Sequence, residues 1–305
     1  MTKKQNTKKN KPKKKTEPKF ESKKIQSPGK KLLPIFTIIV IVCIIGIIWL
    51  VLNPSVEAEE TSAQLVIDSG TVQVKHEGGS WASAENGMLL YQSDSVKTGD
   101  DSSASIILFE TSVVRLDSNT EVTIDELTQQ EETNVLLSQD SGRTWNTISK
   151  MSGIDDYEVQ TPTTVASVRG TAFVVIVEEN GTTYYGVSHG VLNVSSISNG
   201  VIQDQIDVSG NESVLVIINL INESLEISPF EMDEWVLENL LKDEQFVGDL
   251  MDELYSRIDE YIPDLKAEYG ISDMELDALL EGYILGYLEL PADSPDWIKE
   301  LFDFS

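Results

Sequence analysis

The sequence predicts a mainly β protein. An all-β domain of stacked hairpins or a sandwich is expected between one N-terminal membrane-spanning helix and a C-terminal acidic helical region. Three observations lead to this prediction. Residues 32–52 contain no ionisable charge. Residues 64–228 contain short runs rich in Val, Ile and Thr, separated by Gly, Asn, Asp and Ser. Residues 229–305 repeat apolar side chains at helical spacing.

Charge is distributed unevenly along the chain of 305 residues, whose net charge is −28. Residues 1–31 contain thirteen Lys and two Glu, net +11, whereas residues 53–305 are net −39. The basic tail is of low complexity and has no aromatic residue except Phe20. We therefore expect it to be disordered and to lie against anionic lipid, rather than to bind nucleic acid.

The apolar block, LLPIFTIIVIVCIIGIIWLVL, is long enough to cross a membrane. As a helix, residues 32–52 would be about 31 Å long, which matches the bilayer core. A buried soluble helix and a signal peptide cleaved near Val56-Glu57-Ala58 are the alternatives. The long basic leader and the long apolar core favour an uncleaved anchor. The Lys-rich flank should stay in the cytoplasm, which would place residues 53–305 outside the plasma membrane.

Residues 53–63 form a short acidic linker to the predicted β domain. Helical patterns do not alternate with the strand patterns of residues 64–228, so parallel βαβ units are not expected. The spacing of the strands favours a sandwich, a barrel or stacked hairpins. The sole cysteine, Cys43, lies in the apolar block, so no disulfide is available to stabilise this domain.

The pattern becomes helical after Ser228. Ser228, Pro229 and Glu231 have the spacing of a capping box with proline in the first turn, and similar start signals occur at Ser272 and Ser294. We expect three or four short helices in residues 229–305, which contain 22 acidic and four basic residues, net −18. Their apolar stripe should pack within the bundle or on the β domain; a docking face for a partner helix is the alternative.

The stretch TPTTVASVRGTAFVVIV, residues 161–177, resembles a strand with an Arg and a Gly in its middle. Its apolar side chains change parity near Arg169-Gly170-Thr171, which predicts a β-bulge there. We expect Arg169 to anchor this corner of the sheet through a paired charge. A ligand-binding Arg is the alternative.

This stretch resembles the TP…A.VRGT.F.V signature of FecR-like domains. The segments DSVKTGDDSSASIILF…SVVRLDSNTEVTI and SGRTWNTISKMSG before it and GVSHGVLNV after it also resemble the family pattern and occur in the expected order. The resemblance covers roughly residues 64–195. Ser93 replaces a family glycine, and Glu110-Thr111 stands where the family has Asp-Gly. We expect the matched motif residues to be structural: Thr98, Gly99, Thr161, Pro162, Val168, Arg169, Gly170, Thr171 and Phe173.

The resemblance implies a single-pass membrane protein with an extracytoplasmic β domain. The best-known relatives pass a signal to a cytoplasmic sigma factor through a folded anti-sigma domain. Residues 1–31 show no apolar period from which such a domain could fold. A binding and signalling module that engages an envelope protein or glycan is therefore the expected function, and a sigma-type regulator is the less expected partner. A structural or adhesive envelope protein is the alternative.

No motif predicts an enzyme, a metal or a cofactor. The two histidines, His76 and His189, lack metal-ligand spacing, and neither a phosphate-binding loop nor a nucleophile elbow is present. The segment SQDSGRTW (138–145) matches one Asp-box, but propellers need repeats. We expect a hairpin turn through Asp140-Ser141-Gly142 with Trp145 packed beside it.

Overall fold

The chain divides into two units, Met1–Ala58 and Glu59–Ser305. The structure, a computed structural model, describes parts of the second unit only: residues 61–130, 132–168, 170–198, 200–217, 225–259, 261–270 and 272–284. The predicted tail, the predicted membrane span (32–52) and most of the linker lie outside these residues. None of the helices among them is long and apolar enough to cross a bilayer.

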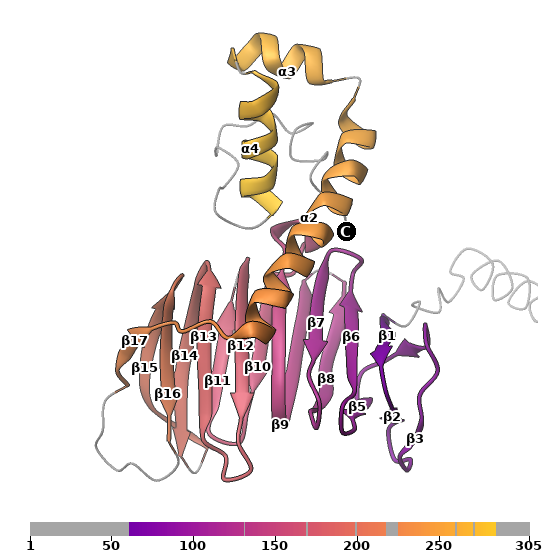
Figure 1. The fold of residues 1–305 in the computed structure, drawn as a ribbon, viewed down its shortest axis with the longest axis vertical. Coiled ribbons are helices and arrows are strands. Elements are labelled where there is room, and N and C mark those ends of the chain that lie inside the picture. The colour runs from indigo at the N-terminus through magenta and orange to yellow at the C-terminus, as the bar shows by residue number, and fades with distance from the viewer. Residues whose placement is uncertain are drawn as a thin grey trace, which may run out of the picture. The chain divides into compact units, whose positions relative to one another are not determined.

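Two β-sheets form the body of the described chain, and strand β9 (Thr133–Ile148) belongs to both (Figure 1). We call them sheet A and sheet B. Neighbouring strands of sheet A are, in order, β4 (Leu89–Leu90), β1 (Ala63–Ser69), β6 (Ser103–Leu108), β7 (Ser112–Leu116), β9, β12 (Thr171–Val177), β13 (Thr183–His189), β16 (Glu212–Val216) and β17 (Ile227–Pro229).

Sheet B repeats this arrangement on the other side of the core. Its neighbouring strands are, in order, β3 (Ala82–Ser83), β2 (Val72–Lys75), β5 (Ser95–Thr98), β8 (Glu121–Gln129), β9, β10 (Asp156–Gln160), β11 (Thr164–Val168), β14 (Val191–Ser198) and β15 (Val201–Ser209). These pairings are antiparallel except that of β10 with β9, which is parallel.

One hydrophobic core lies between the sheets, so the prediction of a mainly β domain is confirmed. Alternate residues of each strand point inward, as in β8, where Val122 and Ile124 are buried. Tyr157 of sheet B and Phe173 of sheet A meet edge to face with ring centroids 6.4 Å apart. Both are fully buried, and each side chain of this size contributes about 1.5–3 kcal/mol through burial.

The chain passes between the sheets at Gly170 and again at Gly190. At Gly170 it leaves β11 in sheet B for β12 in sheet A, and at Gly190 it returns from β13 to β14. Both glycines have positive φ angles, 70° and 83°. A Cβ on Gly190 would lie 2.6 Å from the carbonyl oxygen of Gly170. The two arms of one long hairpin therefore bend together, and glycine allows their backbones to touch.

The predicted bulge at 169–171 is wrong, and the change of sheet takes its place. The change of parity is real, because Ala166 and Val168 share one core with Phe173 and Val175. A strand within a single sheet would need an extra residue to achieve this. A chain that crosses between facing sheets does not, because the same core lies on the inner side of each. The register shift between β12 and β13 lies on β13 instead.

Strand β9 makes the same crossing without interruption. Up to Ser141 it pairs in sheet B, and from Gly142 it pairs in sheet A. Gly142 has a φ angle of 87°, and a Cβ there would lie 2.4 Å from the Cα of Thr120. The predicted hairpin turn through Asp140 is therefore wrong, since these residues bend a continuous strand. Trp145 does pack as expected and is fully buried.

Three helices follow the sheets in the described chain: α2 (Glu234–Ile258), α3 (Ile262–Tyr269) and α4 (Asp273–Ile284). The predicted helix start at Ser228 is wrong, because Ser228 and Pro229 lie in β17 and pair with β16. Helix α2 begins after Asp233, whose carboxylate accepts a hydrogen bond from the Val236 N–H at 3.0 Å. An aspartate in this position satisfies a free backbone donor of the first turn.

The predicted start of α4 at Ser272 is confirmed. The Glu275 N–H donates to the Ser272 hydroxyl at 3.3 Å, and the Ser272 N–H donates to the Glu275 carboxylate at 2.8 Å. This reciprocal pair is a capping box. The third predicted start, at Ser294, lies outside the described residues. Helix α2 has 25 residues and is longer than the short helices expected.

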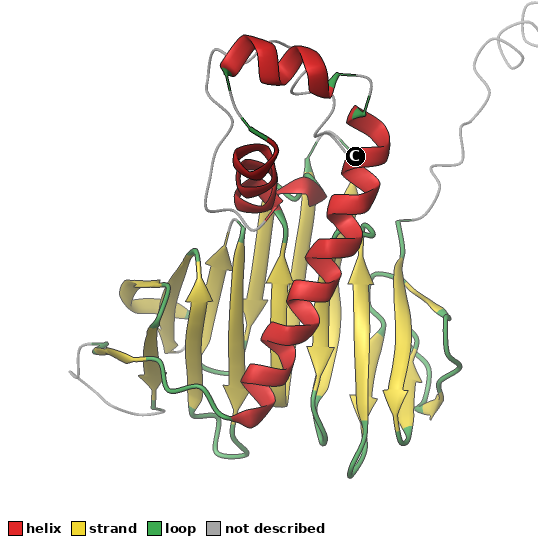
Figure 2. Ribbon diagram, turned by 45° about the horizontal axis from the view of Figure 1, so that its top comes forward, coloured by secondary structure: helices red, strands yellow, loops and turns green. Residues whose placement is uncertain are grey.

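Helix α2 runs across the outer face of sheet A (Figure 2). Near its start, Val236 packs with Trp145 and Val174 of the sheet. Its second half forms a separate apolar cluster with α4 and with the 3₁₀ turn η1 (Lys150–Ser152) of the β domain. The buried members of this cluster are Met151, Val247, Leu250, Leu254, Ile258, Leu276, Leu280 and Ile284.

Candidate functional site

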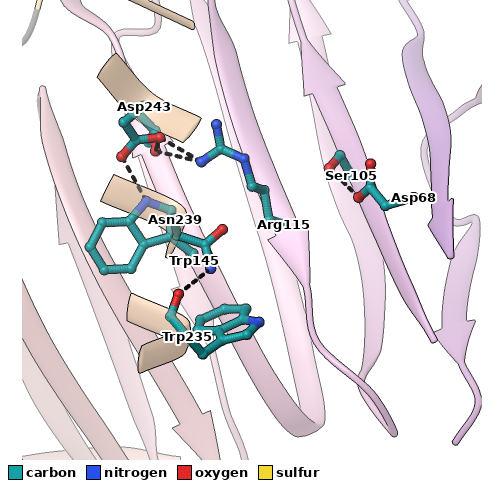
Figure 3. A network of polar contacts seen from close by, with 8 residues as sticks. Asp68, Ser105, Arg115, Trp145, Trp235, Asn239 and Asp243 are labelled. Carbon is teal, nitrogen blue, oxygen red and sulfur yellow. Dashed lines mark hydrogen bonds and ion pairs between the residues drawn. The ribbon is translucent and has the colours of Figure 1, made fainter. Parts of the chain in front are cut away.

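Asp243 is the centre of the contact between α2 and sheet A. Its carboxylate is buried and accepts three side-chain donors from the sheet (Figure 3). Arg115 of β7 forms an ion pair with it at 2.5 Å, the Trp145 indole N–H donates at 2.8 Å, and the Thr147 hydroxyl donates at 2.7 Å. A buried carboxylate is tolerated when it is paired and hydrogen-bonded in this way. We call these four residues the Asp243 latch.

The periods of strand and helix bring the latch together. On β7, Val114 and Leu116 point into the core, so Arg115 points outward. On β9, Trp145 and Thr147 share the same outer face. On α2, Asp243 lies on the buried stripe with Val236, Asn239, Val247 and Leu250.

The first turn of α2 has its own attachment to sheet A. Arg143 of β9 forms an ion pair with the capping residue Asp233 at 2.7 Å. Its guanidinium also lies over the Trp235 ring, 4.3 Å from the ring centroid, in cation–π geometry. The hydrogen bond from Arg143 lowers the pKa of Asp233 below its usual value, although partial burial opposes this effect. The carboxylate therefore serves as both helix cap and ion-pair partner.

The interface between α2 and sheet A also contains buried polar atoms without partners. Among the described residues, the Asn239 amide oxygen and the Arg143 Nε have no hydrogen-bond partner. The Asn239 amide nitrogen donates to the Trp235 carbonyl oxygen within α2, at 2.9 Å. An unpaired buried polar atom costs about 1–3 kcal/mol. The free energy of this interface is therefore less favourable than that of an interface in which every buried polar atom has a partner.

His189 lies at the end of β13, beside the interface between α2 and sheet A, and lines the same small cavity as Thr147 and Phe246. It is buried, and burial lowers the pKa of its imidazole below the usual value, while the charge of Asp243 opposes that shift. The neutral ring is therefore favoured in the folded protein.

The sequence-predicted motif residues lie elsewhere in the domain. Thr161 belongs to a buried hydroxyl network at the β10–β11 turn, which also contains Pro162. Its hydroxyl lies 2.6 Å from that of Thr164 and 3.1 Å from that of Thr183, and Thr164 also lies 2.6 Å from the Tyr185 hydroxyl. Burial raises the pKa of Tyr185. This network ties the β10–β11 turn to β13.

The remaining residues of that signature surround the change of sheet at Gly170. Val168 ends β11, Phe173 lies in the core, and the Thr171 hydroxyl donates to the Val191 carbonyl oxygen at 3.2 Å. Arg169 lies outside the described residues, so its anchoring role stays a prediction.

Thr98 and Gly99 form a separate corner at the end of β5. The buried Thr98 hydroxyl donates to the Asp117 carbonyl oxygen at 2.5 Å and accepts from the Thr120 N–H at 2.9 Å. The Gly99 N–H donates to the Thr71 carbonyl oxygen at 3.0 Å. Neither residue belongs to the Asp243 latch.

Sequence reasoning missed the latch, although two signals pointed to it. Asp243 is an acid on the apolar stripe of a helix, and Arg115 is a base within a strand of otherwise uncharged residues. Each charge needs a partner when buried. The described residues contain no group of three or more His, Cys, Asp or Glu that could hold a metal ion. The latch is suited to holding a helix.

The sequence profile of the FecR protein family matches residues 94–193. The chain carries a FecR-like domain. The matched range includes the latch residues Arg115, Trp145 and Thr147 and the two changes of sheet at Gly170 and Gly190.

No curated protein matches the chain. Two crystal structures of a candidate anti-sigma factor from Parabacteroides distasonis ATCC 8503 are similar to it, each at 17% identity with a TM-score of 0.37. Each match covers 45% of this chain and 60% of that protein.

Proposed function

We propose that the chain is a membrane-anchored binding and signalling module whose FecR-like domain faces outside the plasma membrane and engages an envelope partner. The FecR match supports the regulatory class. The uncharged block at 32–52, preceded by a tail of net +11, supports the anchor and its orientation. The lack of an apolar period in residues 1–31 makes a sigma-type regulator the less favoured partner.

The Asp243 latch is the observation that carries this proposal. Arg115 and Trp145 lie in the segments that carry the FecR resemblance, and both bind a carboxylate of the helical region. The FecR-like domain therefore binds α2 and fixes its orientation. A fixed orientation of the acidic helices suits recognition of a partner rather than catalysis.

Crosslinking in cells tests the proposal. The full chain and a form that lacks residues 5–22, and so keeps the lysines next to the apolar block that orient the anchor, are crosslinked, purified in detergent and compared for captured proteins and glycans. We expect both forms to capture the same envelope partner, because the tail serves only as an anchor flank. Capture of a cytoplasmic regulator by the full chain alone would instead establish a signal path through the tail. Recovery of only self-assembled polymers would support a structural or adhesive role and contradict the proposal.

A further inference from the structure

An open cleft of about 770 Å³ lies at the β1 end of sheet A. Its lining includes Gln64 of β1, Tyr91 after β4, Phe109 and Glu110 in the β6–β7 turn, and Gln129 at the end of β8. Ligand sites in proteins commonly have volumes of about 300–1,000 Å³. The cleft has no part in the Asp243 latch and contains none of the sequence-predicted motif residues.

A second cleft, of about 580 Å³, lies at the β8–β9 turn and is separate from the first. It is lined by Thr128, Gln130, Glu132 and Asn134. Among the residues that the structure describes, the two linings together contain amides, hydroxyls, two carboxylates and two aromatic rings, but no Lys or Arg. Phosphates and other anionic ligands, which proteins bind with these cations, are therefore poor candidates.

This lining suits a neutral sugar. A Gln amide offers donors and an acceptor, and a carboxylate accepts from two donors at once, so together they can bind neighbouring hydroxyls. Tyr91 and Phe109 offer apolar ring faces, and Tyr91 adds a hydroxyl that can donate or accept a hydrogen bond. Leu89 and Ile107, which also line the cleft, offer an apolar contact for a small methyl group such as that of an N-acetyl substituent.

Two of the residues that line this cleft have left-handed backbone conformations. Six described residues other than glycine have positive φ angles, and three of them are neither Asn nor Asp: Ser93, Phe109 and Glu110. Ser93 is two residues from Tyr91, while Phe109 and Glu110 line the cleft itself. A left-handed conformation costs such residues about 1–2 kcal/mol. Phe109 packs against the core, which offsets its cost, whereas Glu110 is exposed. Phe109 and Glu110 are the two central residues of the β6–β7 turn, which the Thr111 N–H closes by donating to the Leu108 carbonyl oxygen at 3.2 Å, and such a turn requires positive φ at both positions. The turn therefore holds the Glu110 carboxylate exposed at the rim of the cleft.

We propose that this cleft binds a neutral, N-acetylated oligosaccharide, with Tyr91 under a sugar ring and with Gln129 and Glu110 bound to its hydroxyls. This inference rests on the proposed function, because it names the chemistry of the envelope partner. It adds a glycan site at the β1 end of sheet A to the acidic helices that the Asp243 latch holds in place.

The test measures binding of an N-acetylglucosamine tetramer to the full chain by calorimetry and by saturation-transfer NMR. The chain is kept in a detergent without a sugar headgroup. Glu110→Gly should raise the melting temperature, because glycine tolerates positive φ, yet weaken binding about tenfold. Ser93→Gly relieves the same strain outside the lining and should leave binding unchanged. Tyr91→Ala and Gln129→Ala should also weaken binding about tenfold, whereas Gln203→Ala, an exposed amide of β15, should not.

No binding by the unaltered chain, or equal binding by all five variants, would overturn the inference. A glucose tetramer that bound as tightly as the N-acetylated one would overturn the assignment of the N-acetyl group. The proposed function is tested by a different outcome. Capture of an envelope protein by a chain that binds no sugar would leave that function in place and remove only the glycan cleft.

Discussion

At the scale of single residues, the contact between the β domain and the helical region depends on a charge that cannot be buried alone. Asp243 accepts hydrogen bonds from Arg115, Trp145 and Thr147 at once. Loss of its carboxylate leaves the buried guanidinium without a counter-charge, with only a 3.5 Å hydrogen bond to the Thr147 hydroxyl, and leaves the indole N–H without its acceptor. The cost of removing one member of such a group exceeds the net value of the complete group.

Asp243→Ala should therefore lower the free energy of unfolding by about 3–5 kcal/mol, measured by urea denaturation at pH 7. Combining it with Arg115→Met removes the unpaired charge and should recover part of that loss. Asp249→Ala, an exposed acid on the same helix, is the control and should stay within about 0.5 kcal/mol. A loss for Asp243→Ala as small as that of the control would show that the latch is not formed.

The contact between Gly170 and Gly190 gives a second prediction. Gly190→Ala adds a Cβ 2.6 Å from the Gly170 carbonyl oxygen, in addition to the strain of a positive φ angle. Gly200→Ala adds the same kind of strain in open space, because nothing lies within 4 Å of its Cβ. We expect Gly200→Ala to cost about 1 kcal/mol and Gly190→Ala at least about twice as much, by urea denaturation. Equal costs would contradict the close approach of the two backbones.

At the scale of elements, α2 connects two apolar clusters and depends on its first turn for its attachment. Asp233 caps the helix and pairs with Arg143, and this pairing lowers its pKa. The Asp233 carboxyl is protonated less readily in the folded protein than in the unfolded chain. The ion pair therefore stabilises the fold at pH values above the ordinary pKa of 3.8. That stabilisation is lost as the pH falls from there through the lower folded pKa.

Asp233→Asn keeps the cap but removes the charge. We expect its urea midpoint to lie below that of the unaltered protein at pH 7, and the difference to shrink as the pH falls from about 5 to below 3.8. Asp233→Ala removes the cap as well and should be less stable than Asp233→Asn throughout this range. A difference between the unaltered protein and Asp233→Asn that does not change with pH would contradict the ion pair.

The elements also show how far the sequence could be interpreted. Strand alternation predicted the β domain, and Ser272 with Glu275 predicted the start of α4, because both signals are local. Ser228-Pro229 carries an equally good local signal, but pairing with β16 places it in a strand. Likewise, the alternation of apolar side chains along the sequence changes at 169–171. Only the long-range pairing of β11 and β12 with different partners shows that the chain changes sheet there.

At the scale of the whole molecule, charge polarity is the main organising feature. Residues 1–31 are net +11 and residues 53–305 are net −39, on either side of an uncharged block. The acidic part should stay soluble through its charge, while the basic tail favours an anionic membrane surface. The candidate site could not be predicted in the same way. The latch joins residues 128 positions apart in the chain, and no short motif contains both partners.

Side-specific labelling of single cysteines tests the membrane-anchored orientation most directly. The sole native cysteine, Cys43, is replaced by Ser, and Gln5→Cys or Gln203→Cys is added to mark the tail or the β domain. Cells stripped of their wall are then treated with a membrane-impermeant maleimide before and after permeabilisation. We predict that Gln203→Cys reacts in intact cells and that Gln5→Cys reacts only after permeabilisation. Protection of Gln203→Cys until the membrane is opened would contradict the account.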